Sequence, residues 1–383
     1  MTWKPELTIS VNGVNRKSIT LADVLIFYGR NSVWEQPRSS YARIAILNSA
    51  GTDYGFDMNQ SVSIKVKDTY GADQTIFTGK ITEVDNNLTG SGTIGTNAIQ
   101  TITAVGPFSR MSRKIIGTGN WPKEMDTDRM TRIFNNSGVT TDTVDTPAIY
   151  EFASRPANAI DGYTAAASFA QQAFGYIYET PDYKVGFANE SRRTNDAKAN
   201  GYTVIPNNYI LWNNVSSQKT LADILNNMTL TYDSGTKTAT DATSIANYGQ
   251  VDGSISTTLH NASDAQTQAD RYVTLRANPR TSLSSFTIPL NSSNVSDVLR
   301  NTFISITMGR PIEVTNLPIA LKNTTYRGFV EGYSFSINQY EMILNLVTSD
   351  YTYSFTPARW QDVSAALTWN AVGAAVQWDT YDD

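Results

Sequence analysis

Apolar and polar residues alternate along much of the chain with a period of two, the pattern of strands that bury one face and expose the other. In the first part this alternation predicts six strands, over residues 7–11, 24–28, 41–47, 62–66, 76–84 and 99–105. Gly, Asn and Asp residues separate them, and Asn12-Gly13 predicts a tight turn after the first strand. Short strands at such spacing are typical of sandwiches and barrels. We therefore expect residues 1–112 to form a first β-domain.

The pattern changes after residue 112, where apolar residues fall at the spacing of helices. One predicted helix contains Met130, Ile133 and Phe134 and ends at Gly138. A second has apolar residues at 166, 169, 170, 173 and 174 and is expected to end with Gly175 as its C-cap. Two short strands, 176–179 and 184–188, follow. Residues 113–205 are therefore expected to form a small α/β domain.

Strand patterning resumes at residues 228–232 and again near the end of the chain, on either side of a helix expected over residues 262–276. We expect further strands over residues 284–290, 303–308, 326–337 and 340–347. These elements predict a second β-domain that is discontinuous, built from residues 206–236 and 308–350. Residues 237–307 would form a helical and β insertion, and residues 351–383 a C-terminal arm. The predicted fold class is mainly β with small α/β insertions.

A triplet of strands is repeated within the chain. Residues 62–66, 77–81 and 99–105 resemble residues 311–314, 326–330 and 342–347. Each copy places an aromatic residue two positions before a glycine, Phe77 before Gly79 and Tyr326 before Gly328. Glycine inside a strand is typical of a bulge or of the close approach that bends a strand around a barrel. The repeat indicates two related β-barrels, and chance likeness between strands is the alternative.

Three tryptophans recur at a spacing of nine residues in the C-terminal arm: Trp360, Trp369 and Trp378. The eight-residue units that begin at the first two align position by position. An odd period would turn successive tryptophans to opposite faces of one strand, so we expect a turn in each repeat, for which Gly373 is one candidate. Since the arm has little core of its own, we expect these tryptophans to dock, either on the same chain or on a partner.

Composition excludes several classes of function. Charged residues make up 17% of the chain, and the net charge of -5 is spread without a run of Lys and Arg, which does not favour groove-bound nucleic acid. No cysteine is present, which excludes disulfides, thiolate metal sites and cysteine nucleophiles. The first residues lack the features of a signal peptide and no run of 18 apolar residues occurs. We expect folding in a cytoplasm and no membrane span.

The residues that could support catalysis are few. His260 is the only histidine and lies just before the helix expected at 262, where a loop or capping role is expected. Glu151, Asp161 and Glu179 are the carboxylates that could serve a glycosidase. Asp161 is better explained as a helix N-cap and Glu179 as a strand residue. We therefore expect no catalytic, metal or cofactor site, and no enzyme.

Several segments resemble known phage proteins. Residues 29–37, followed by 42–47, look like the N-terminal motif of minor tail proteins in siphophages of Gram-positive, especially actinobacterial, hosts. Residues 77–81 with 104–107 resemble the first barrel of baseplate hub proteins, and residues 244–249 resemble their second insertion domain. The tryptophan-bearing C-terminus is also similar to many actinophage examples. The chain is thus similar to siphophage minor tail proteins and distal baseplate hubs.

This resemblance implies two tandem tail-tube-like β-barrels per chain and a homotrimer, whose six barrels form a pseudo-sixfold ring. The implied role is to join the sixfold tail tube to the threefold tip and to line the channel through which DNA leaves, without sequence-specific binding. Implied partners are the tail tube or distal tail protein, the tape measure protein and other tip proteins. The implied location is the distal end of the tail in the virion, with roles in host attachment and genome ejection.

Two other functions remain open at this stage. The Trp and Tyr content suits a receptor-binding or carbohydrate-binding tail-tip protein, because aromatic faces stack on sugars. A wall-degrading enzyme is the third possibility, although no lysozyme or peptidase segment is recognised. Glycan-array binding would favour the former and zymography on host cell walls the latter.

Overall fold

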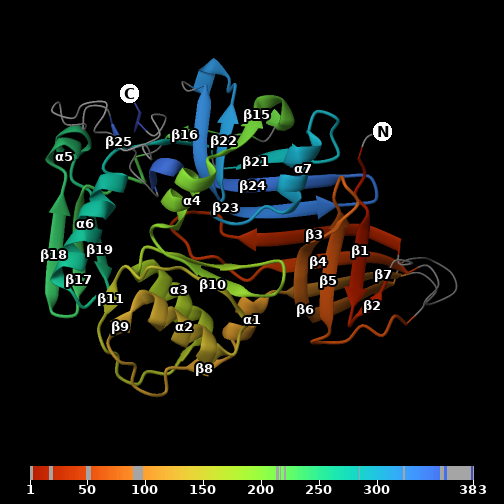
Figure 1. Ribbon diagram of the computed structural model, residues 1–383, viewed down its shortest axis with the longest axis horizontal. Helices are drawn as coiled ribbons and strands as arrows, with labels where there is room; N and C mark the ends of the chain where they lie inside the picture. Colours follow the sequence, from red (N-terminus) through yellow and green to blue (C-terminus); the bar gives the residue numbers. More distant parts are fainter. Residues whose placement is uncertain are drawn as a thin grey trace.

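The computed structural model describes residues 3–16, 20–48, 53–88, 98–212, 215, 217–219, 221–283, 285–321, 324–353, 358–359 and 381–382. Figure 1 shows strands running across the upper and right parts of the molecule, with helices α1 to α3 below them and α5 and α6 at the left end. The chain is mainly β with few helices, as predicted. None of the helices in this described part is long and apolar enough to cross a membrane.

Twelve strands of the described residues form one sheet, whose order is β15-β22-β23-β3-β4-β7-β6-β5-β1-β2, with β21 paired to β24 and β24 to β23. Its N-terminal half is made of β1 (Leu7–Val11), β2 (Val14–Asn15), β3 (Thr20–Gly29), β4 (Tyr41–Asn48), β5 (Ser61–Lys67), β6 (Asp73–Leu88) and β7 (Ala98–Val105). Its C-terminal half is made of β15 (Thr203–Pro206), β21 (Ser285–Pro289), β22 (Pro311–Thr315), β23 (Thr325–Ile337) and β24 (Met342–Asp350).

The two halves are continuous because β3 pairs with β23, from Val24 opposite Ile337 to Gly29 opposite Gly332. Along β4 and β5 every second residue is buried, as the period-two pattern predicts. One hydrophobic cluster contains buried residues of both halves, such as Ile44 and Leu344. The two halves of the sheet therefore share one hydrophobic cluster.

The repeated triplet recurs in the structure as two sets of antiparallel strands, β5-β6-β7 and β22-β23-β24. In both sets the aromatic ring lies over the glycine two residues later: a Cβ on Gly79 would lie 2.6 Å from the Phe77 ring, and one on Gly328 would lie 3.0 Å from the Tyr326 ring. Both central strands change register three residues after that glycine, at residue 82 in β6 and at Glu331 in β23. The two triplets thus share pairing, ring placement and bulge.

The helices α2 (Asp126–Ser137) and α3 (Gly162–Gln172) pack against a small sheet of β10 (Thr141–Val144), β14 (Val185–Ala188) and β13 (Tyr176–Glu179), and α1 (Pro107–Met111) packs against α3. Gly138 ends α2 in the left-handed conformation, as predicted. Gly175 is not the C-cap of α3, because Ala173 takes that position and Phe174 has the positive φ of 56°. Gly175 instead allows close approach to β14, since a Cβ there would lie 2.5 Å from the Ala188 carbonyl oxygen.

A further group of elements, called the insertion below, consists of α5 (Ala242–Tyr248), α6 (Ala262–Arg276) and a sheet of β18 (Gly235–Thr240), β17 (Asn227–Tyr232) and β19 (Asp252–Ser256). β17 falls in the range 206–236 expected in the second β-domain, but among the described residues it pairs only with β18 and β19 of this small sheet. Alternation identifies a strand without identifying its partner. The strand expected at residues 303–308 is partly helix α7 (Asp297–Ile304), which Ser296 caps.

Shorter elements complete the described chain. The short strands are β8 (Ile115–Ile116), β9 (Glu124–Met125), β11 (Glu151–Phe152), β12 (Ile160–Asp161), β16 (Ser217–Lys219), β20 (Thr281–Leu283), β25 (Ala358–Arg359) and β26 (Tyr381–Asp382). The remaining helical segments are α4 (Arg192–Asn200), η1 (Asn207–Tyr209), η3 (Ile319–Leu321) and η4 (Tyr351–Tyr353). A second hydrophobic cluster joins the insertion to the α/β unit, with Leu259 and Phe152 buried together.

Candidate functional site

The strands β3 and β23 come unusually close where they join the two halves of the sheet. Gly29 has a φ of +90°, and a Cβ on it would lie 2.7 Å from the Cα of Gly332. A Cβ on Gly332 would lie 2.5 Å from the carbonyl oxygen of Arg30. Both positions therefore require glycine, and the backbone leaves the sheet here with Arg30 directed at the partner strand.

A buried ion-pair cluster of Arg30, Arg193 and Glu331 lies at this junction. Oε2 of Glu331 accepts hydrogen bonds from Nε of Arg30 at 2.7 Å and from Nη2 of Arg193 at 2.8 Å, and Nη2 of Arg30 lies 2.6 Å away. Ser349 donates to Oε1. The bulge in β23 directs Glu331 into the interior, where its side chain is fully buried.

The two arginines of this cluster stabilise the charged form of Glu331. Burial alone would raise the pKa of Glu331, but the neighbouring charges of Arg193 and Arg30 outweigh it and lower that pKa to about 2. Arg193 belongs to α4 and its guanidinium lies over the Tyr176 ring, 4.8 Å from the centroid. The cluster thus ties the α/β unit to both halves of the sheet.

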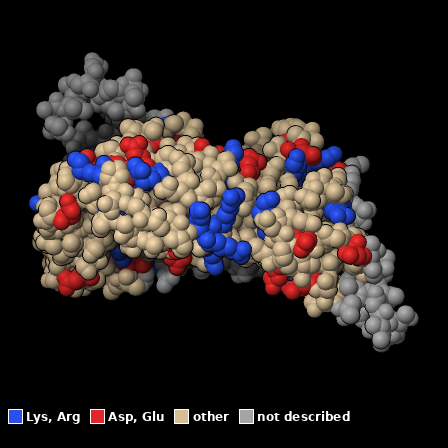
Figure 2. All heavy atoms as spheres, turned by 90° about the horizontal axis from the view of Figure 1, so that it is seen from below, with Lys and Arg blue, Asp and Glu red and all other residues tan. Residues whose placement is uncertain are grey.

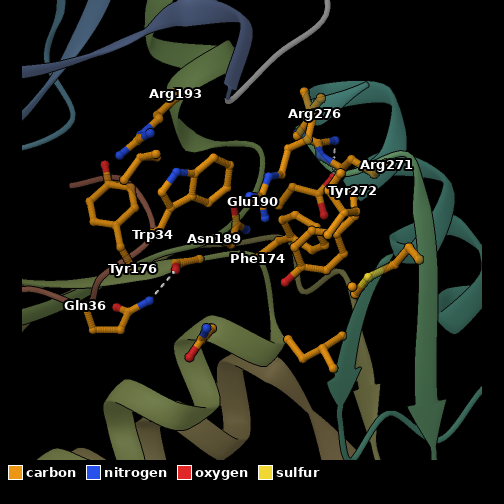
Figure 3. Close-up of a pocket in the computed structure, with 18 of the residues that line it drawn as sticks. Trp34, Gln36, Phe174, Tyr176, Asn189, Glu190, Arg193, Arg271, Tyr272 and Arg276 are labelled. Atoms are coloured by element: carbon orange, nitrogen blue, oxygen red, sulfur yellow. Dashed lines mark hydrogen bonds and ion pairs between the residues drawn. The ribbon is translucent and has the colours of Figure 1, made fainter. Parts of the chain in front are cut away.

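A pocket of about 320 Å³ opens beside the ion-pair cluster, between the β3–β4 loop, the α/β unit and the insertion. Four rings line it, and Figure 3 shows Trp34 between Tyr176 on one side and Phe174 with Tyr272 on the other. The guanidinium of Arg276 stacks over Trp34 at 4.2 Å. The wall is completed mainly by arginines and by polar groups: Arg30, Gln36, Asn189, Glu190, Arg193 and Arg271.

The polar groups of the pocket wall hold neighbouring units in place. Arg271 of the insertion forms an ion pair with Glu190, which also accepts from the hydroxyl of Tyr150. Gln36 donates from Nε2 to the carbonyl of Gly175 at 3.2 Å. The pocket therefore lies where three parts of the chain meet, a common location for binding sites.

Glu179 forms a second contact point between β13 and the N-terminal half of the sheet. Its carboxylate accepts from the backbone N–H of Ser40 and from that of Phe108, both at 2.5 Å. Burial raises the pKa of Glu179 to about 7, against the opposing effect of these hydrogen bonds. The residue is in a strand, as predicted, but it also holds the first turn of α1 against β4.

The other candidate catalytic residues have structural partners. Asp161 caps α3 by accepting from the N–H of Thr164 at 2.8 Å, as predicted. Glu151 pairs with Lys123 at 2.9 Å. His260 lies just before the Asn261 N-cap of α6, with Nδ1 3.4 Å from Asp233. Across the described residues no three His, Cys, Asp or Glu side chains gather as metal ligands.

The predicted docking residues Trp360, Trp369 and Trp378 lie outside the described residues. On either side of them, β25 and β26 pair in parallel, with Ala358 opposite Tyr381. Sequence reasoning missed Glu331 and its two arginines. One sign was available: Glu331 is a lone carboxylate in the apolar run from Phe329 to Tyr333, which predicts a buried and therefore paired charge.

Comparison with known proteins shows likeness in structure without detectable likeness in sequence. No family model and no curated protein matches the chain. The 43 kDa tail protein of prophage MuSo2 from Shewanella oneidensis matches with a TM-score of 0.65 and 9% identity over 92% of this chain and 100% of that one. A tail protein from Neisseria meningitidis MC58 gives 0.64 and 10%, over 92% and 98%. Prophage tail protein gp18 from Listeria monocytogenes EGD-e gives 0.55 and 10%, over 90% and 95%. The chain therefore has the fold of these tail proteins.

Proposed function

We propose that this chain is a structural, non-enzymatic component of a bacteriophage tail, and that it serves as the baseplate hub at the distal tip. The observation that carries the proposal is the extent of the structural match, which covers 92% of this chain and all of the MuSo2 tail protein. The likeness therefore concerns the whole architecture rather than one shared module. Fold alone does not fix function, so the role must be tested directly.

The repeated triplets support a hub with two related barrels per chain. β5-β6-β7 and β22-β23-β24 share their pairing and the position of their bulge. Three chains would then present six similar barrels to a sixfold tail tube and a threefold surface to the tip. In the described sheet β15 is an end strand, and its Val204 side chain is 45% exposed. A strand at the end of a sheet can pair with a strand of a neighbouring subunit.

The distribution of charge favours an orientation of the proposed hub in which one basic hollow faces away from the DNA channel. A hollow of about 610 Å³ contains Lys80, Arg110 and Arg113, and no Asp or Glu is among the described residues of its wall. Figure 2 shows a group of basic side chains near the middle of one face, with further acidic and basic side chains toward both ends. A basic channel wall would retain DNA by phosphate attraction. We expect the basic hollow to face a protein neighbour, such as the distal tail or tape measure protein, and not the channel.

Removing the chain from the phage or prophage that encodes it tests the proposal. A hub is required for assembly, so we expect particles without completed tails in electron micrographs. Complete tails that fail to adsorb would refute the hub role and favour the receptor- or carbohydrate-binding role. Complete tails that adsorb but leave the cell wall intact would indicate the wall-degrading role. Light scattering on assembled hubs is expected to give three times the chain mass of 42.1 kDa.

A further inference from the structure

The start of the C-terminal arm lies within about one helix length of the pocket beside the ion-pair cluster. η4 follows β24 directly and packs against α6. Tyr272 and Arg276 of α6 line the pocket. α6 has 15 residues and is about 22 Å long at ~1.5 Å per residue, so η4 and the pocket are separated by no more than about that length. The seven residues from Tyr353 to Trp360 span up to about 25 Å when extended, which brings an arm tryptophan within reach.

The chemistry of the pocket suits an indole side chain. Its wall presents the rings of Trp34, Phe174, Tyr176 and Tyr272, and the centroids of Phe174 and Tyr272 are 4.3 Å apart. Aromatic rings bind one another in stacked or edge-on pairs, and an indole face also attracts guanidinium groups. Rings and arginines line the same cavity (Figure 3), so a planar aromatic group can contact both kinds.

Charge also favours the arm as the occupant. The arm after Tyr353 contains four Asp and one Arg, a net charge of -3 out of -5 for the whole chain. The pocket wall contains Arg30, Arg193, Arg271 and Arg276 against Glu190. Attraction between the acidic arm and this wall acts over about one Debye length, roughly 8 Å at physiological salt.

We propose that this pocket is the docking site for a tryptophan of the chain's own C-terminal arm, residues 354–383. Docking there would join the arm to the β3–β4 loop, the α/β unit and the insertion at once. It would also place the acidic residues beside the arginines of the wall. The inference concerns packing within one chain, and it stands or falls independently of the proposed role in a tail.

A fluorophore at the pocket rim tests this assignment in the full-length protein. The chain has no cysteine, so Ser254→Cys introduces a single thiol at an exposed lining position for a bimane label, whose emission a nearby indole quenches. Trp34 is present in every variant and contributes to the background quenching of each. Replacing Trp360, Trp369 and Trp378 together by Phe keeps an aromatic ring in the arm but removes the quencher. We expect emission to rise at least twofold, and one of the three single replacements to reproduce the rise.

The same label at Val298→Cys on α7, a side chain that is 67% exposed, is the matched control, and its emission should not change with the arm substitutions. Unchanged emission at Ser254→Cys in the triple variant would overturn the proposal. So would a rise in emission when unsubstituted labelled protein is diluted a hundredfold, because the indole would then come from a second copy. Equal far-ultraviolet circular dichroism of all variants shows that the secondary structure of the body of the protein is intact.

Discussion

Replacing Glu331 by Gln should destabilise the protein strongly while preserving the shape of the side chain. The substitution leaves the buried guanidiniums of Arg30 and Arg193 without a counter-charge. Removing one partner of a buried pair typically costs about 3–5 kcal/mol. The pKa of Glu331 gives an independent figure: a fall from 4.5 to about 2 corresponds to about 3 kcal/mol of preference for the charged form in the native state. We therefore expect a loss of about 3 kcal/mol at pH 7.

Urea unfolding of both proteins between pH 7 and pH 2 measures this loss. Because the native pKa is lowered, the contribution of Glu331 is complete above pH 4.5 and disappears as the pH falls through about 2. The difference between wild type and Glu331→Gln should shrink over that interval. Glu313→Gln is the control, since its ion pair with Arg327 is partly exposed and should contribute less than about 1 kcal/mol. A loss below ~1 kcal/mol for Glu331→Gln, or a difference that does not change with pH, would refute this account.

Three further outcomes are expected. Burial raises the pKa of Glu179 from 4.5 to about 7, so its contribution to stability is complete below pH 4.5 and is lost as the pH rises through about 7. Glu179→Gln should therefore flatten the dependence of Tm on pH between 5 and 8. An unchanged slope would contradict this. Gly79→Ala places a Cβ 2.8 Å from the carbonyl oxygen of Val105, and Gly328→Ala places one 2.5 Å from that of Ser349. Each should lower stability by about 1–3 kcal/mol in thermal unfolding. Gly119→Ala is the control and should not lower stability, because a Cβ there meets open space. Deleting residues 358–383 should lower Tm if the arm docks on its own chain, and Trp369→Ala should cost about 3–5 kcal/mol if its ring is buried. An unchanged Tm with failed tail assembly would place the docking groove on a partner. If the deletion changes neither Tm nor tail assembly, the arm is dispensable.

The sequence determined those features that depend on residues close to one another along the chain. Alternation of apolar and polar residues located most strands to within a few residues, because the faces of a strand are set by its own side chains. A carboxylate directly before a helical pattern predicted Asp161 as an N-cap, because such a cap bonds to a backbone N–H only three residues away. The aromatic-x-Gly repeat was also visible in the sequence, since each ring covers a glycine only two residues away.

Tertiary structure alone decided which strands pair and which charges meet. The pattern of β17 shows that one face of the strand is buried but does not identify the element that covers this face. The strand pairs within the insertion rather than in the large sheet. Arg30 and Glu331 are 301 residues apart, and no local property of either predicts the other. Their contact depends on the path that brings β3 beside β23, and the pocket exists only where that junction meets the insertion. Burial within a shared core is a property of the whole chain, and so is the partner of each buried charge.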